Sequence, residues 1–231
     1  MSPKTRRRLL IAVGGLVALV VLVVGGTYLY INVINDDAPA PLALETTPPD
    51  STSRPVETAE LDGTWSIADG SEAGYRVDEV LNGQDNTVVG RTSEVTGEVT
   101  VAGGDATAAE VTVDMASITT DSGSRDGQFR GPIMQTDDFP TSTFTLTEPV
   151  PLDELDGSGP VSITATGDLT VRDVTQPIEI QLDLQLVGEE VQVAGSAQIT
   201  FADFEVDPPN LGFVRVEDEG TVEFLLTLSR G

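Results

Sequence analysis

The sequence predicts an all-β domain, an antiparallel β-barrel of about eight strands, preceded by one N-terminal transmembrane helix and a linker rich in Pro, Ser and Thr. Three observations support it: apolar and polar residues alternate in the C-terminal part, turn-forming residues separate these runs, and an uncharged stretch lies near the N-terminus. They divide the chain into a basic cytoplasmic segment (1–8), a transmembrane signal anchor (9–31), an extracytoplasmic linker (32–60) and the barrel domain (61–231).

The predicted anchor, residues 9–31, carries no charge, and a helix of that length spans roughly 34 Å, enough for a hydrocarbon core of about 30 Å. A basic cluster precedes it, and Asp36 and Asp37 follow it, so the N-terminus is expected in the cytoplasm. A cleavable signal peptide is the alternative, but the nearest small-residue site, residues 38–40, is followed by Pro41. We expect a single-pass cell-membrane protein with an extracytoplasmic C-terminal domain.

The linker, residues 32–60, has the composition of a solvated tether. It contains five prolines and several Ser and Thr residues, without apolar periodicity. Fully extended, it would reach on the order of 90 Å, so the domain could stand clear of the membrane or fold back onto it.

Composition restricts the possible functions. The chain contains no Cys and no His, which removes disulfides, thiol catalysis, the usual transition-metal ligands and the commonest general base. We therefore predict no enzymatic activity and no metal site; a carboxylate-dependent enzyme would need two converging acids, which the sequence does not show. From residue 61 onward there are 7 Arg and 32 Asp or Glu, so this part carries 7 − 32 = −25. Such a field excludes nucleic acid as a partner.

The barrel strands are predicted from alternation with period two, which places apolar residues on one face and polar residues on the other. No long amphipathic helix follows the anchor, and only residues 124–136 are expected to form a short helical or irregular excursion. Turn signals separate the runs, such as Asn82-Gly83 and Gly188. The alternating runs lie within residues 95–101, 111–115, 161–165, 178–186, 191–193, 197–201 and 222–228.

A closed barrel follows because strands with one apolar face and no helix layer must bury that face against themselves. Aromatic residues make up only 5% of the chain, so bulky interior plugs are scarce and a tubular apolar cavity for a long-chain ligand is one prediction. An interior filled by Val and Ile is the other. The candidate lining residues are Val99, Val113, Ile163, Ile180, Leu182, Ile199 and Phe224.

Two blocks of the sequence resemble the YceI-like family. The first runs through residues 114–121 (DMASITTD), 124–130 (SRDGQFR) and 137–144 (DDFPTSTF). The second is residues 167–178 (GDLTVRDVTQPI), similar to a family hairpin of the form G-x-L-T-(I/V)-(R/K)-G-V-T-x-P. Residues 63–67 and 88–90 also fit, so the resemblance covers most of the predicted domain.

The resemblance implies a lipocalin-like eight-stranded barrel, periplasmic or secreted, that holds a polyisoprenoid or similar long-chain amphiphile. Three positions depart from the family pattern: Gln128 stands where members commonly have His, Asp173 replaces a Gly, and Ala202 stands where an Arg is usual. These departures bear on the head group of the ligand rather than on the fold.

Arg125 and Asp126 lie in the most distinctive loop of the first block. We predict that they contact the polar head group of the ligand at the barrel mouth. A guanidinium offers forked donors to phosphate or quinone oxygens. The alternative is that the pair pins its own loop through hydrogen bonds. Trp65 is expected to close the base of the barrel, and the acids of residues 121–127 have the wrong spacing for calcium.

The function expected from the sequence is that of a non-catalytic, membrane-anchored binding protein for a polyisoprenoid, quinone or similar lipid. No other cofactor is expected, and the oligomeric state is left open. A structural or adhesive envelope module with a packed barrel, acting through a protein partner, is the alternative.

Overall fold

The computed structural model describes residues 21–26, 38–44, 58–157 and 159–231. Residues 21–26 are helical with exposed side chains, and within the described ranges no helix is both long and apolar enough to span a bilayer. The predicted basic segment and most of the predicted anchor and linker lie outside these ranges, so the anchor stays a prediction.

One antiparallel sheet of twelve strands makes up the described part of the domain. The strands are β1 (Gly63–Ile67), β2 (Glu72–Leu81), β3 (Gln84–Thr92), β4 (Val95–Ala102), β5 (Asp105–Asp114), β6 (Thr141–Leu146), β7 (Val150–Pro151), β8 (Val161–Val171), β9 (Val174–Val187), β10 (Glu190–Thr200), β11 (Val214–Val216) and β12 (Glu219–Arg230).

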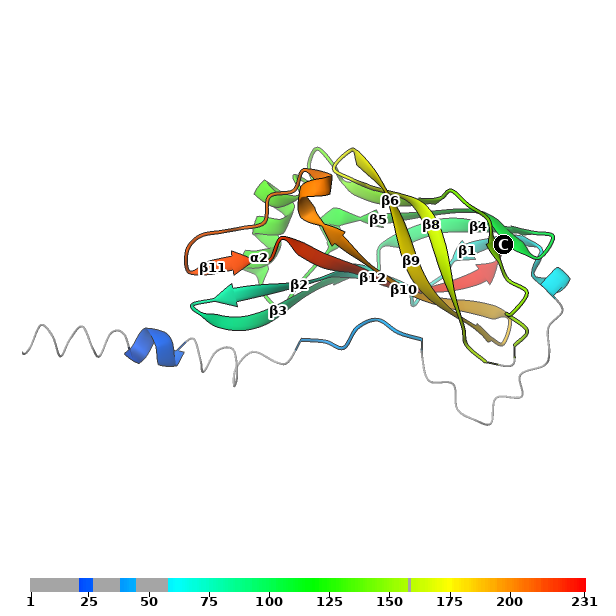
Figure 1. Ribbon diagram of the computed structural model, residues 1–231, viewed down its shortest axis with the longest axis horizontal. Coiled ribbons are helices and arrows are strands. Elements are labelled where there is room, and N and C mark those ends of the chain that lie inside the picture. Colours follow the sequence, from blue (N-terminus) through cyan, green and yellow to red (C-terminus); the bar gives the residue numbers. More distant parts are fainter. Residues whose placement is uncertain (1–20, 27–37, 45–57, 158) are drawn as a thin grey trace, which may run out of the picture.

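Eight of these strands close a ring in the order β1-β4-β5-β6-β8-β9-β10-β12, because the end of β12 pairs with β1 (Figure 1). Trp65 lies opposite Arg230 and Ile67 opposite Leu228 at this closure. The predicted eight-stranded antiparallel barrel is confirmed. Every pairing of the ring joins residues between Gly63 and Arg230, so its hydrogen-bonded wall is complete without the segments upstream.

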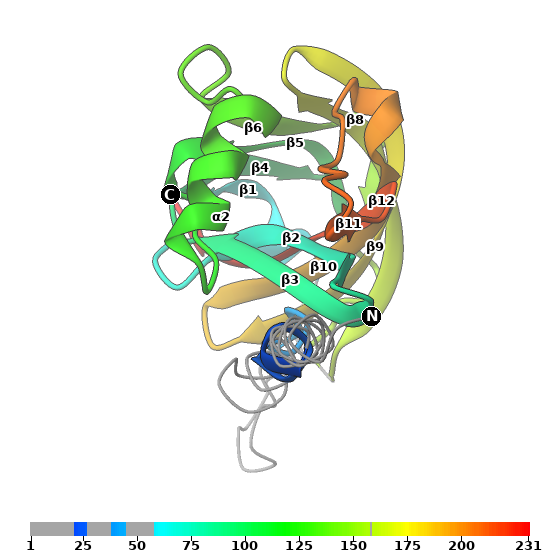
Figure 2. The same ribbon diagram turned by 90° about the vertical axis from the view of Figure 1, so that its left-hand side faces the viewer.

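The wall extends beyond the ring at one end. The first half of β12, residues 221–225, pairs with β2, and the β2–β3 hairpin projects outward with β11 added along the outer half of β2. Asn82 and Gly83 turn this hairpin with φ angles of 51° and 80°, as a two-residue turn with both angles positive requires. Figure 2 views this end, where β2, β3, β11 and α2 lie toward the viewer.

Short helices lie at the same end, in the connection between β5 and β6. After β5 the chain forms η3 (Met115–Ser117), α2 (Gly123–Gln128) and η4 (Phe129–Ile133), and a bridge between Arg91 and Thr119 ties this excursion to β3. The predicted excursion at residues 124–136 is therefore confirmed. Two further one-turn helices, η2 (Thr58–Leu61) and η5 (Phe201–Phe204), precede β1 and follow β10.

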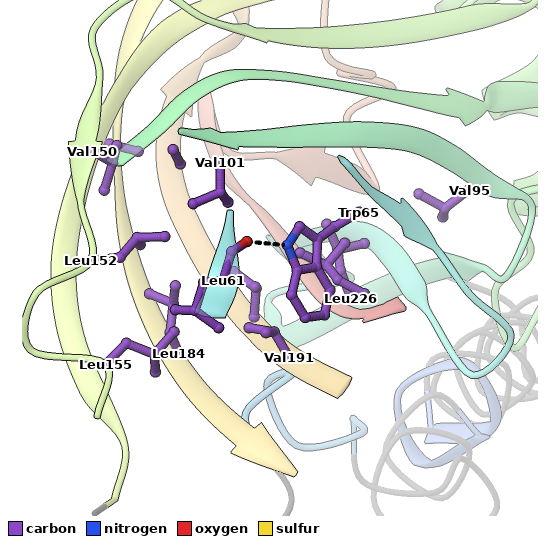
Figure 3. Close-up of a cluster of buried hydrophobic side chains, with 14 of the residues drawn as sticks. Leu61, Trp65, Val95, Val101, Val150, Leu152, Leu155, Leu184, Val191 and Leu226 are labelled. Atoms are coloured by element: carbon purple, nitrogen blue, oxygen red, sulfur yellow. Dashed lines mark hydrogen bonds between the residues drawn. The ribbon is translucent and has the colours of Figure 1, made fainter. Parts of the chain in front are cut away.

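The opposite end is closed by an apolar cluster around Trp65 (Figure 3). Only 4% of Trp65 is exposed, its indole Nε1 donates to the carbonyl oxygen of Leu61 at 2.9 Å, and the Arg230 guanidinium covers the ring at 5.1 Å from its centroid. Leu152 and Leu155 pack into the same cluster. Trp65 thus closes the base, as predicted from its place in the first strand.

Residues 38–44 lie along the outside of the barrel, near the β2–β3 hairpin and β12. Arg76 donates to the carbonyl oxygen of Pro39 at 2.6 Å, and Arg91 donates to that of Ala40 at 2.5 Å. The same two arginines pair with Glu223, whose carboxylate is 3.6 and 2.8 Å from their nitrogens and which is only 2% exposed. This part of the predicted linker is therefore docked rather than free.

Among the strands that the sequence did not delimit, β2 carries both apolar and polar side chains on its inner face. On β2 the inward positions include Tyr75 and Glu79, which interrupt the apolar alternation. Pattern alone thus located the uniform strands and missed those that carry polar inward groups.

We expect Trp65→Ala to lower the free energy of unfolding by about 3–5 kcal/mol, because loss of the indole leaves a void in the apolar cluster at the closed end. Urea unfolding of residues 32–231 measures this. Thr64→Ala, an exposed position on the same strand, should change it by less than about 0.5 kcal/mol. Equal effects of the two substitutions would contradict the role given to Trp65.

The docking of residues 38–44 can be tested with a spin label, because the chain has no cysteine and Ala43 is exposed. A nitroxide on Ala43→Cys should be immobilised in the otherwise unchanged protein. Replacing both Arg76 and Arg91 by Met should sharpen its spectrum to that of a mobile label, whereas Arg215→Met on β11 should not. A label that is mobile from the outset would show that the segment does not dock.

Candidate functional site

The barrel encloses a cavity of about 660 Å³, a size within the range of roughly 300–1,000 Å³ that is typical of ligand sites. Its lining reaches from Trp65 and Leu155 at the closed end to Arg125 in α2 and Leu211 before β11 at the other. Figure 1 shows β1 and β11 near opposite ends of the barrel, so the cavity follows the long axis.

All seven residues predicted to line the barrel do face this cavity. They come from strands β4, β5, β8, β9, β10 and β12, at the inward positions of the alternating pattern. The alternative of an interior filled by Val and Ile does not hold, because these side chains leave an open space between them. Their contact with a ligand stays a prediction. The seven are Val99, Val113, Ile163, Ile180, Leu182, Ile199 and Phe224.

Aromatic rings lie flat against glycines of the neighbouring strands, which keeps the cavity open. A Cβ added at Gly195 would come within 3.0 Å of the Phe224 ring, and one at Gly167 equally close to the Phe144 ring. Gly195 is directly opposite Phe224 in the β10–β12 pairing. A side chain at either glycine would push a ring toward the barrel axis, so these two glycines help to set the free volume.

Charged and polar groups of the lining gather at the end covered by α2. Arg125 pairs there with Glu79 at 3.3 Å and with Asp121 one turn earlier. Asn86 on β3 donates to the same Glu79 oxygen at 2.8 Å, and Glu79 is only 6% exposed. Ser124 and Gln128, on α2 with Arg125, also line the cavity.

Asp126 has a different position from the one expected of a head-group ligand. It is buried and does not line the cavity; its carboxylate accepts from the backbone N–H of Thr120 at 2.8 Å and from the Thr120 hydroxyl at 2.7 Å. These bonds fix the turn that leads into α2. Of the predicted pair, Arg125 faces the cavity, while Asp126 pins its own loop, as the alternative interpretation held.

Tyr75 stacks on Phe129 below this rim, with ring centroids 5.1 Å apart. Burial raises the pKa of its hydroxyl well above the usual value; Arg125 opposes this shift, and the carboxylates of Asp126, Asp121 and Glu79 add to it. The hydroxyl therefore stays protonated at physiological pH, where it can donate a hydrogen bond.

Sequence reasoning missed Tyr75, Glu79 and Asp121 as neighbours of Arg125. Glu79 was hidden in a strand without clean alternation, and Asp121 was considered only as a calcium ligand. Within the described residues no three acidic groups come together in a way that could hold a metal ion. Contact between Glu79 and Arg125 depends on how α2 packs over β2, which no local pattern encodes.

The two sequence blocks noted above have defined structural roles. Arg172 and Asp173 form the β8–β9 turn with φ angles of 50° and 62°, and Asp tolerates this conformation where a glycine is otherwise usual. Arg172 also donates to the carbonyl oxygens of Ile133 and Glu205, both at 3.1 Å, which joins η4 to η5. Gln128 lines the cavity, and Ala202 is an exposed residue of η5.

Comparison with known protein families matches residues 65–228 to the YceI-like domain. The chain belongs to the YceI-like family. This match covers the ring apart from the first two residues of β1 and the last two of β12, so the resemblance of the two sequence blocks is confirmed. A search of curated protein sequences finds no significant match for this YceI-like chain.

Two solved structures share the fold of this YceI-like barrel. A polyisoprenoid binding domain from Saccharophagus degradans, implicated in plant cell wall breakdown, has a TM-score of 0.60 and 21% identity; 73% of this chain and 99% of that chain are covered. BcnA from Burkholderia cenocepacia has a TM-score of 0.52 and 19% identity, covering 66% of this chain and 95% of that one. At these identities the likeness shows the fold.

Gly195→Ala should reduce the capacity of the cavity, because the added Cβ forces the Phe224 ring toward the axis. We expect uptake of a fluorescent apolar probe by the purified protein to fall by at least half. Gly131→Ala is the control, because a Cβ there meets nothing within 4 Å. Unchanged probe uptake in Gly195→Ala would contradict this account of the free volume.

Proposed function

We propose that this protein is a membrane-anchored, extracytoplasmic binding protein that holds a polyisoprenoid, a quinone or a similar long-chain amphiphile in its barrel, without catalysing a reaction. The observation that carries the proposal is the long cavity of about 660 Å³, lined mainly by aliphatic side chains. Burial of an apolar chain contributes roughly 25 cal/mol per Å² of surface removed from water. The similarity to a polyisoprenoid binding domain supports the same ligand class.

The ligand should lie with its chain toward the closed end and its head at the α2 end. The base around Trp65 and Leu155 offers only apolar contacts, whereas the rim offers Tyr75, Glu79 and Arg125. A polar head buried at the base would lose its hydrogen bonds to water without replacement, which is unfavourable.

The α2 end is also the proposed entrance. Leu211 and Phe213, in the turn before β11, are 64% and 57% exposed, and Leu211 also lines the cavity. The turn is ordered by hydrogen bonds from the Leu211 amide to the Val214 carbonyl oxygen at 2.9 Å and from the Asn82 amide to that of Phe213 at 2.7 Å. Apolar surface thus continues from the cavity to the outside of the barrel, as the entry of an apolar lipid chain requires.

Membrane attachment and extracytoplasmic placement rest on the sequence. The uncharged stretch of residues 9–31 after a basic cluster supports an anchor with the barrel outside. An anchored barrel would stay close to the bilayer from which its ligand comes. The alternative, a structural module that acts through a protein partner, predicts a packed barrel, and the cavity argues against it.

Mass spectrometry of an organic extract tests the proposal. Residues 32–231, purified without detergent, should carry a near-stoichiometric isoprenoid, quinone or other long-chain lipid. A clean extract, with no uptake when such lipids are offered, would refute the proposal and favour a protein that acts through its outer surface.

A matched pair of variants assigns the lipid to the cavity. Ala165→Phe adds a ring at a buried inward position on β8 that lines the cavity, so the bound lipid should fall to less than a tenth. Thr96→Phe adds the same ring on the exposed outer face of β4 and should leave the lipid unchanged. Thermal unfolding of both variants verifies that each is folded, since overpacking typically costs about 1–3 kcal/mol.

A further inference from the structure

The charges around the cavity mouth carry an inference about the head group, which rests on the proposed function. We propose that the mouth selects amphiphiles with a neutral, oxygen-bearing head, a hydroxyl or a carbonyl, and rejects those with a phosphate or diphosphate, and that Glu79 is the residue that sets this preference. The preference follows from the partners of Arg125, the neutral donor at the rim and the charge of the surrounding domain.

Arg125 is already neutralised by its neighbours. Its guanidinium lies 3.3 Å from the Glu79 carboxylate and pairs with Asp121 as well. Asp126, which is buried within the same helix, adds a third acid. Counted formally, the group carries one positive and three negative charges, 1 − 3 = −2. An anionic head arriving here would meet net negative charge, so like-charge repulsion disfavours it.

Within the described part of the chain, no second cation compensates for these acids. Among the described residues that line the cavity, Arg125 is the only Lys or Arg. The other arginines near this end have partners of their own: Arg76 and Arg91 pair with Glu223 on the outer face, Arg130 of η4 donates to the Ile118 carbonyl oxygen at 3.4 Å, and Arg172 donates to two backbone carbonyl oxygens. Arg215 lies between the lining residues Val214 and Val216 on β11, so it belongs to the opposite face.

A neutral oxygen finds suitable partners at the same place. Tyr75 lines the cavity beneath the rim, and its protonated hydroxyl can donate to a carbonyl or accept from a hydroxyl. Ser124 and Gln128, also in the lining, are neutral groups that can both donate and accept. A carbonyl or hydroxyl head can therefore be satisfied without disrupting the Glu79–Arg125 pair.

Glu79 determines the outcome because it is the buried partner of the pair. At 6% exposure it is held in place by Asn86, which donates at 2.8 Å, whereas Asp121 is exposed. Glu79→Gln keeps an oxygen that can accept from Asn86 and removes one negative charge. Arg125 would then keep only the exposed Asp121 as an ion-pair partner, which an incoming anion can displace, and its forked donors are well suited to that anion.

Two commercial isoprenoids with the same chain test the inference: geranylgeraniol, with a neutral hydroxyl head, and geranylgeranyl diphosphate. Both are titrated against lipid-free residues 32–231, which retain the whole ring and the docked segment, by displacement of a fluorescent apolar probe. For each ligand the dissociation constant of the variant is divided by that of the unchanged protein. The difference in water solubility between the ligands then cancels.

We expect Glu79→Gln to tighten binding of the diphosphate by about tenfold or more and to change binding of the alcohol by less than about threefold. Glu110→Gln, which removes the same charge from an exposed position on β5, should affect neither ligand. If Glu79→Gln proves unfolded by thermal denaturation, Asp121→Asn tests the same release of Arg125 from a surface position.

Three results would overturn the inference. In the first, Glu79→Gln leaves the affinity for the diphosphate unchanged. In the second, Glu110→Gln raises that affinity as much as Glu79→Gln does, which would show that only the net charge of the protein matters. In the third, the unchanged protein binds the diphosphate at least as tightly as the alcohol. Failure of the unchanged protein to bind either isoprenoid is a distinct result, because it refutes the proposed function and the head-group selection with it.

Discussion

Strand β12 pairs with β10 along one edge and, along its other edge, first with β2 and then with β1, and this double pairing closes the sheet on itself. Closure satisfies the backbone hydrogen-bonding groups that would otherwise remain open at two sheet edges. It also turns one face of every ring strand inward, which creates the cavity. Because β2 leaves the ring where β1 joins it, the wall is longer on one side, and that extension supports the mouth.

The interior is hollow because of the side chains at the inward positions of the strands. They are mostly Val, Ile, Leu and Ala, and the larger rings of Phe144 and Phe224 lie flat over glycines instead of filling the axis. An empty apolar cavity forgoes dispersion contacts, and a ligand that binds only the folded state would restore them and stabilise the protein. The closed end around Trp65 and Leu155 is packed, so the barrel combines a rigid base with an adaptable channel.

The mouth has the opposite chemistry from the channel. Among the described residues, the single arginine of the lining is surrounded by two buried acids, Glu79 and Asp126, and by the exposed Asp121, in a domain that carries −25 from residue 61 onward. Two arginines that could have served an anionic ligand are instead engaged outside with Glu223 and with the carbonyl groups of residues 39 and 40. The arginines of the described domain therefore serve mainly to neutralise buried carboxylates and to hold segments together, since an unpaired buried carboxylate would be destabilising.

Alternation of apolar residues is a local property, so the sequence by itself determined six of the eight ring strands, with their inward faces and all seven predicted lining residues. Alternation did not delimit the other two ring strands, β1 and β6. The motifs at residues 114–144 and 167–178 determined the family in the same way. Only the tertiary structure decided that the inward side chains leave a cavity, because free volume depends on how rings and glycines of different strands meet. It also decided that Glu79 lies against Arg125, that Asp126 turns to Thr120, and that residues 38–44 dock on Arg76 and Arg91. Most of these contacts join residues far apart in the chain, and strand order and register, which bring them together, are not encoded in any single segment.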